Sequence, residues 1–351
     1  MPSSIQVTKR LLSLIADEDS SDEQIAQAAR GLLQSTHGTS ASNINNVLEV
    51  VSLGLDVDDP NRASVLMMVC GSLVELGAKT TPLHEPLIRQ FHKLIEQSHS
   101  FHEAMLSNLP NSKNKDRDRA TALRLASAEL PDEAEAWNAL EQSYPAGIAL
   151  FSVSREARHL ASRELASVRD IAEFHPGAGW LWKILQVLDD EPLLVIEPLT
   201  GLGIVGRMNG VSDNFQLNVL LMDVFPRGWF QRRRVSKLAA NVARGIGPQQ
   251  TDDAIYGAWN LYTKVALNSD GTLPDPKDHE ADKTTAVWNE GIPADIPLLD
   301  GHRVVLLGPK SYIRTWRAQR DFNLLRADIS KVRKLKQAEV ENWLDRIRTS
   351  S

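Results

Sequence analysis

The stretch that decides how the second half of the chain folds is EPLLVIEPLTGLGIVGRMNGV, residues 191–211. Its apolar run, Leu193 to Ile196, lies between two prolines, a pattern typical of a short buried strand. The segment Thr200 to Gly203 has the composition of a turn. A second group of apolar residues follows this turn and completes a predicted β-hairpin: Ile204, Val205, Met208 and Val211.

The residues before this hairpin predict helices. Ser21 precedes two acidic residues, a pattern typical of a helix N-cap. Pro60 is predicted to lie in the first turn of another helix, where proline is accepted. No repeat of fixed length relates one helix to the next, so no named repeat family is predicted. We expect a helical bundle or a short stack of helical hairpins. The predicted helices cover about 5–15, 22–31 or 22–34, 42–51, 60–77, 86–101, 116–130, 132–142 and 154–174.

The residues after the hairpin mix strand and helix signals. Phe215–Phe225 fits either element, with its apolar spacing in favour of a helix, while 268–300 is rich in proline and predicts a long surface loop. Hairpin-like strands with helices at the edges predict α+β overall, with an all-α N-terminal half and a mixed α/β C-terminal domain with antiparallel strands, and argue against a doubly wound parallel sheet. Further elements are a helix at 179–188, strands at 255–266 and 303–307, and a helix at 337–348.

The composition changes near His175 and Pro176, which predicts two domains, 1–175 and 176–351. The first segment has 16 Lys and Arg against 24 Asp and Glu, and the second has 23 against 21, so an acidic half precedes a weakly basic one. Trp137 is the single tryptophan before this boundary, and seven follow it. A chain of 351 residues also exceeds the usual size of one hydrophobic core.

The overall composition predicts a soluble protein in the cytoplasm. Residues 1–21 lack the order of a signal peptide, because acidic residues follow Ile15 almost at once. No uncharged apolar stretch approaches the length that spans a bilayer, so no membrane partner is expected. Cys70, the one cysteine, lies in an apolar run, where we interpret it as a buried side chain, and a chain with one cysteine forms no internal disulfide.

Two motifs suggest chemistry, and each has a simpler interpretation. Gly201, Gly203 and Gly206 have the spacing of a dinucleotide-binding loop, but the next residues continue an extended segment instead of opening a helix, so we favour a glycine-rich hairpin turn. Two Glu-x-x-His elements, Glu96/His99 and Glu156/His159, match part of a carboxylate di-metal site in a helical bundle. We interpret them as polar helix faces, and predict neither a metal nor a cofactor.

The strongest compositional signal is basic. No acidic residue occurs between Asp223 and Asp252, and a second basic run covers 303–336. Aromatic residues within these runs provide material for contacts with phosphates and stacked bases, or with a protein partner. The candidates for an anion or partner site are Arg227, Trp229, Arg232, Arg233, Arg234, Lys237, Arg314 and Arg317.

No motif names a reaction, so we expect a non-catalytic binding or scaffold protein with a helical partner surface and a Trp- and Arg-rich recognition domain. Its expected partner is another protein or a second copy of the chain. Two alternatives stay open: an enzyme with its site in the C-terminal domain, or a protein that binds nucleic acid or another polyanion through the basic runs. Polar residues at strand ends and beside tryptophan are the pocket candidates: Asp213, Asn214, Trp259, Asn260, Asn289 and Glu290.

Overall fold

The structure is a computed structural model that describes residues 3–109, 115–226, 233–274, 285–310 and 314–350. The chain divides into two compact units, Met1–Leu185 and Gln186–Ser351. The α+β class is confirmed, with helices throughout the first unit and a mixed sheet in the second. Helix α10 (Pro176–Leu185) begins where the composition changes but belongs to the first unit, because it packs against α7 and α9.

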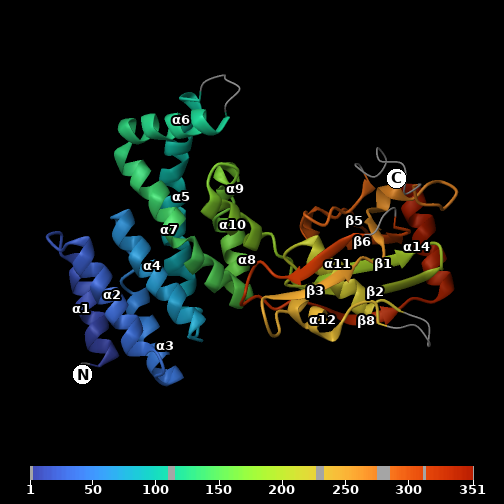
Figure 1. The fold of residues 1–351 in the computed structure, drawn as a ribbon, viewed down its shortest axis with the longest axis horizontal. Coiled ribbons are helices and arrows are strands. Elements are labelled where there is room, and N and C mark those ends of the chain that lie inside the picture. Colours follow the sequence, from blue (N-terminus) through green and yellow to red (C-terminus); the bar gives the residue numbers. More distant parts are fainter. Residues whose placement is uncertain (1–2, 110–114, 227–232, 275–284, 311–313, 351) are drawn as a thin grey trace. The chain divides into compact units, whose positions relative to one another are not determined.

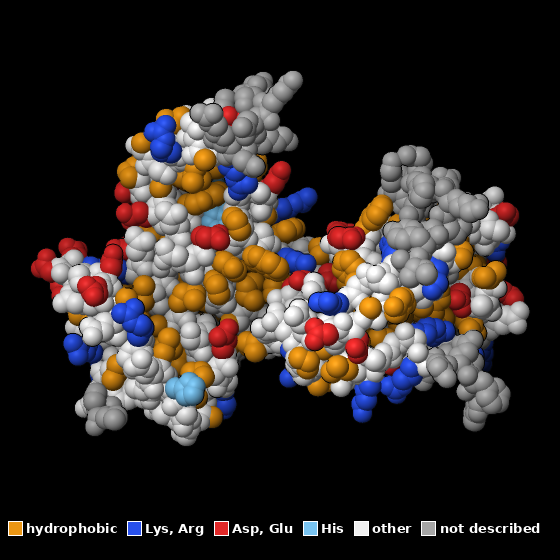
Figure 2. All heavy atoms as spheres, viewed as in Figure 1, with side chains coloured by type: hydrophobic (Ala, Val, Ile, Leu, Met, Phe, Trp, Pro, Cys, Tyr) orange, Lys and Arg blue, Asp and Glu red, His pale blue; other side chains and the backbone are white. Residues whose placement is uncertain are grey.

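Serine or aspartate caps begin several of the described helices in the first unit. Ser3 and Ser21 form capping boxes, and Ser40 and Asp59 accept backbone N–H groups, so that polar groups at these helix starts are satisfied. Figure 2 shows acidic side chains gathered at the turn between the first two helices. The helices are α1 (Ser4–Ala16), α2 (Asp22–Thr36), α3 (Ala41–Ser52), α4 (Pro60–Glu75), α5 (His84–Ser107), α6 (Lys115–Glu129), α7 (Pro131–Val153), α8 (Arg155–Glu164) and α9 (Val168–Ile171).

Helix α7 is the centre of this unit, where it packs against α4, α5, α6, α8 and α10 (Figure 1). The contact with α4 depends on small residues. A Cβ atom added at Gly71 would lie 2.6 Å from the Cα atom of Ala146, so the two backbones approach as closely as they do only because residue 71 is glycine. Cys70, the neighbour of this glycine, is fully buried, and burial raises the pKa of its thiol.

The second unit is built on a mainly antiparallel sheet in which the described strands follow the order β4-β6-β1-β2-β8, with β5 beside β6. Strands β1 and β2 form the predicted hairpin, with Gly201 in a positive-φ turn conformation. Strands β1 and β6 are parallel, so their carboxyl ends meet at one edge. The strands are β1 (Glu191–Glu197), β2 (Leu202–Asn209), β4 (Asn260–Tyr262), β5 (Leu298–Leu299), β6 (His302–Gly308) and β8 (Asp328–Lys334).

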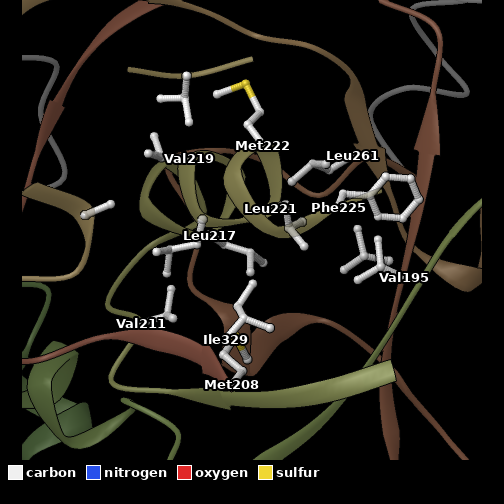
Figure 3. Close-up of a cluster of buried hydrophobic side chains, with 14 of the residues drawn as sticks. Val195, Met208, Val211, Leu217, Val219, Leu221, Met222, Phe225, Leu261 and Ile329 are labelled. Carbon is white, nitrogen blue, oxygen red and sulfur yellow. The ribbon is translucent and has the colours of Figure 1, made fainter. Parts of the chain in front are cut away.

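Strand β1 is buried on both faces because its side chains alternate between two cores. Leu193 and Val195 join the core under α11 (Asn214–Val224) and α12 (Lys237–Ala243). Figure 3 shows Leu217 of α11 above the sheet residues Met208 and Ile329. On the other face Leu194 and Ile196 join a smaller core with α14 (Gln337–Ser350).

Two predictions in this unit need correction. Residues 255–266 were expected to form one strand, but β3 (Gln250–Tyr256) ends before Gly257, β4 follows, and the final residues form a 3-10 turn. Strand β3 pairs with β7 (Thr315–Gln319) in a separate two-stranded ribbon. The prediction that 268–300 is a surface loop is wrong in part, because Val287 and Ile296 are buried in the larger core. Residues 275–284 of that prediction lie outside the described part.

Candidate functional site

A cleft of about 760 Å³ opens at the edge where the parallel strands β1 and β6 end. Ligand sites in sheets often lie outside the carboxyl ends of parallel strands, where connecting segments diverge. We call it the Trp259 cleft. It is lined by Glu197–Leu199, Ala258–Trp259, Asp270–Pro274 and Leu307–Lys310.

Trp259 and Glu197 form the fixed part of this cleft. The indole Nε1–H of Trp259 donates to Glu197 Oε1 at 2.7 Å, and the Thr200 hydroxyl donates to Oε2 at 2.6 Å. The ring of Trp259 packs edge-on against Phe225, with the guanidinium of Arg234 at 4.5 Å from the ring centroid. Because hydrogen bonds hold both of its oxygens, the Glu197 carboxylate has a defined orientation before any ligand arrives.

Two further charged groups line the same cleft. The Asp270 carboxylate accepts hydrogen bonds from the hydroxyl and backbone N–H of Thr272, and the hydroxyl is the main cause of its lowered pKa. The Lys310 ammonium donates to the carbonyl of Gly257 at 3.2 Å. The described lining therefore contains two carboxylates and one ammonium group.

The rest of the lining is mostly apolar. Leu199 is 86% exposed at the rim of the cleft, and Leu273 lies in the wall formed by 270–274. Prolines at 198, 274 and 309 restrict the backbone around the cleft. Such a cleft combines an apolar surface with a few oriented polar groups, as ligand sites do.

A second, smaller cleft of about 380 Å³ contains part of the predicted pocket. It is lined by Phe215, Trp288–Glu290 and Arg314–Trp316. Asn214 fastens one wall, since its backbone N–H donates to the carbonyl of Gly291 at 3.0 Å and its side-chain amide to the carbonyl of Trp288 at 2.8 Å. Phe215 and Trp316 lie with ring centroids 5.7 Å apart.

The six pocket candidates therefore lie at separate places. Asn289 and Glu290 line the smaller cleft, with Asn214 directly behind it, whereas Trp259 belongs to the Trp259 cleft. Asp213 is the N-cap of α11, where its carboxylate accepts from the backbone N–H of residue 216. Asn260 is buried in β4, and its amide donates to the Tyr262 hydroxyl at 3.3 Å.

The candidates of the basic runs are also dispersed. Arg234 is turned inward: its guanidinium donates to the carbonyls of Phe225 and Pro226 at 2.9 and 3.0 Å. Arg233 and Lys237 are exposed near the start of α12, Arg317 is exposed on β7, and Arg314 lines the smaller cleft. The remaining candidates lie outside the described residues: Arg227, Trp229 and Arg232.

Several other cations of the basic runs have partners within the unit. Arg244 pairs with Asp223 at 2.7 Å, and Arg303 pairs with Glu191 at 2.8 Å. Arg320 is buried and donates to backbone carbonyls. These described cations therefore support the fold of the unit.

The Glu-x-x-His elements do not form the interactions that a shared metal site requires. His99 Nε2 lies 3.1 Å from the carbonyl of Ser167, while Glu96 pairs with His92 at 3.5 Å. Glu156 faces His84, 3.9 Å away. In the described part of the chain, no three His, Cys, Asp or Glu side chains gather in a way that could hold a metal ion.

Three histidines of the helical unit are buried. Burial lowers the pKa of His84, His102 and His175 below the usual value for histidine. His175 Nε2 lies 2.9 Å from the carbonyl of Trp137, and its Nδ1 accepts from the backbone N–H of Ala178 at 3.0 Å. A neutral ring with its proton on Nε2 satisfies both contacts, and the Glu141 carboxylate lies 3.2 Å from Nδ1.

The pair of His84 and Ser154 resembles a catalytic arrangement that sequence reasoning missed. Ser154 Oγ lies 3.0 Å from His84 Nε2, and Glu156 stands near the other ring nitrogen. Ser154 is nevertheless the N-cap of α8, where its hydroxyl accepts from the backbone N–H of Ala157. Both Ser154 and His84 are only 8% exposed, so the hydroxyl serves a cap and is closed to substrate.

Across 3–109, 115–226, 233–274, 285–310 and 314–350, no helix has the length and apolar character needed to cross a membrane. Comparisons with known protein families, with curated proteins and with solved structures found no match for this chain.

Proposed function

We propose that this chain is a non-catalytic binding protein whose C-terminal unit recognises an extended segment of a protein partner in the Trp259 cleft. The observation that carries the proposal is the cleft itself. It combines about 760 Å³ of space with a mostly apolar lining and a carboxylate whose two oxygens are held in place. This volume falls within the range of specific ligand sites, roughly 300–1,000 Å³.

The walls of the cleft support binding of a flexible chain. Prolines at 198, 274 and 309 limit the conformations of the wall before a ligand arrives, so less entropy is lost on binding. The exposed side chain of Leu199 would be covered by a partner. An apolar side chain that is free in one protein and covered in a complex provides binding energy of about 1.5–3 kcal/mol.

The charged groups in the cleft support recognition more than catalysis. A general acid or base works best with a pKa near the ambient pH, whereas hydrogen bonds from Thr272 lower the pKa of Asp270. Glu197 is held by two neutral donors and has no described histidine beside it to exchange a proton. A carboxylate that is held in a fixed orientation is suited to bind a ligand group.

The helical unit supports a second role as a partner surface. Leu53 is 81% exposed at the end of α3, beside a cleft of about 270 Å³ that is also lined by Asp56, Pro86 and Arg89. An exposed leucine beside a hollow gives a partner protein apolar surface to cover on binding. The partner of this surface is a second protein or a second copy of the chain.

Selection from a phage-displayed library of random peptides against the full chain tests the proposal. We expect enrichment of peptides that compete with one another for one site. The variant Leu199→Ser removes an apolar side chain from an exposed position at the rim of the cleft. It should fail to retain these peptides. Failure of the natural chain to enrich any peptide above background would contradict the proposal.

A further inference from the structure

We infer that the segment bound in the Trp259 cleft carries a lysine or arginine side chain, whose cationic head binds the Glu197 carboxylate. This inference rests on the proposed function and specifies the chemistry of its ligand. It follows from the hydrogen bonds of Glu197, from the charges that line the cleft, and from the apolar surface beside them.

Among the described residues, Glu197 is a half-buried carboxylate that forms no ion pair. Its described hydrogen bonds come from two neutral donors, the Trp259 indole and the Thr200 hydroxyl, and it forms no ion pair with any described Lys, Arg or His. Two other acidic residues of this unit do have a cationic partner: Glu191 pairs with Arg303, and Asp223 pairs with Arg244. A carboxylate offers about four lone-pair positions, so two donors leave room for a ligand.

Two described cations close to the cleft have partners other than Glu197. Lys310 donates to the carbonyl of Gly257, and Arg234 donates to the carbonyls of Phe225 and Pro226 while its guanidinium stacks on Trp259. Neither group is held by the Glu197 carboxylate. Asp270 adds a second anion to the lining, so that the described lining has a net charge of −1. This charge favours a cationic ligand over an anionic one.

The apolar lining fits the rest of a basic side chain. Lysine and arginine have aliphatic stems that pack on apolar surfaces while the charged head reaches a polar group. Leu199 and the leucine and proline pair 273–274 provide such a surface in the cleft that also contains Glu197. A small free amine would leave the Leu199 side chain exposed. An extended peptide with apolar residues beside the basic one would bury both Leu199 and the apolar wall.

Peptide selection with three matched chains tests this inference: the natural chain, Glu197→Gln and Asp252→Asn. Glutamine keeps an acceptor for the Trp259 indole and removes the charge. Asp252 is exposed on β3 and does not line the cleft, so its variant controls for net charge. We expect the natural chain and Asp252→Asn to enrich peptides with a lysine or arginine beside apolar residues, and Glu197→Gln to lose that preference.

The enriched peptides should bind Glu197→Gln at least about tenfold more weakly than the natural chain, because a hydrogen bond to a charged group contributes about 1.5–3 kcal/mol. Lys310→Gln should not weaken them. Peptides without a basic residue, or equal binding by Glu197→Gln, would overturn the inference while Leu199→Ser still confirms the cleft as the binding site. Weaker binding by Lys310→Gln alone would indicate an anionic ligand. Absence of any enriched peptide would remove the proposed function, and the inference with it.

Discussion

Replacement of Arg234 by alanine should destabilise the C-terminal unit, whereas replacement of its neighbour Arg233 should not. Arg234 is half-buried, donates to two backbone carbonyls and stacks on the ring of Trp259. Arg233 is exposed. The two variants remove the same side chain and the same charge at adjacent positions, so a difference between them isolates the internal contacts of Arg234.

The expected magnitude follows from these contacts. Each hydrogen bond contributes about 1 kcal/mol, and a cation over an aromatic ring contributes about 0.5–1 kcal/mol. Their sum predicts a loss of about 2.5–3 kcal/mol in the free energy of unfolding for Arg234→Ala. In a unit of this length that loss lowers the melting temperature by roughly 5–12 °C. Arg233→Ala should change the free energy of unfolding by no more than about 0.5 kcal/mol.

Differential scanning calorimetry of the full chain provides the assay, because it can resolve a transition for each unit. The transition of the C-terminal unit should move to lower temperature in Arg234→Ala and stay in place in Arg233→Ala. Equal transition temperatures of the C-terminal unit in the two variants would refute the reasoning, since the contacts of Arg234 would then contribute no net stability.

Two further predictions concern the helical unit. Burial lowers the pKa of the three buried histidines in the folded state. Below the histidine pKa of the unfolded state, about 6.5, the unfolded state therefore binds more protons than the folded state. Stability should therefore be full above this pH and fall toward pH 5, and thermal melts across that range that show no loss would contradict the assignment of neutral rings. Gly71→Ala should cost about 1–3 kcal/mol because the added Cβ meets Ala146, whereas Gly31→Ala in α2, with open space around it, should raise stability by about 0.5–1 kcal/mol; urea denaturation of the two variants measures both. Equal changes in the two variants would argue against the close α4–α7 contact.

The sequence predicts those parts of the fold that have a strong local pattern. The four apolar residues 193–196 and the glycine turn after them specified the β1–β2 hairpin, and Ser21 as a cap and Pro60 in a first turn marked the starts of helices. The spacing in 215–225 pointed weakly to a helix, because α11 is buried on nearly all sides and shows little periodicity. The break at Gly257 was missed, since apolar residues continue on both sides of it and the separate partners of β3 and β4 are distant in sequence.

The candidate site could be predicted only in part. Trp259 was among the pocket candidates, but Glu197 and Lys310 were not, because the parallel pairing of β1 with β6 brings their segments together from distant parts of the chain. No local motif marks such a site. Composition also did not distinguish the two described arginines of the run 232–234: Arg234 donates to the carbonyl of Phe225, whereas Arg233 is exposed.

The most direct test of the central claim is the dissociation constant of a selected peptide, measured by isothermal titration calorimetry for the natural chain, Leu199→Ser and Leu238→Ser. Leu238 is also exposed in the C-terminal unit, on α12, and does not line the Trp259 cleft. Loss of a covered leucine predicts binding weaker by about tenfold or more in Leu199→Ser. Binding by Leu238→Ser should equal that of the natural chain. Equal dissociation constants for all three chains would show that the peptide binds elsewhere and would contradict the account.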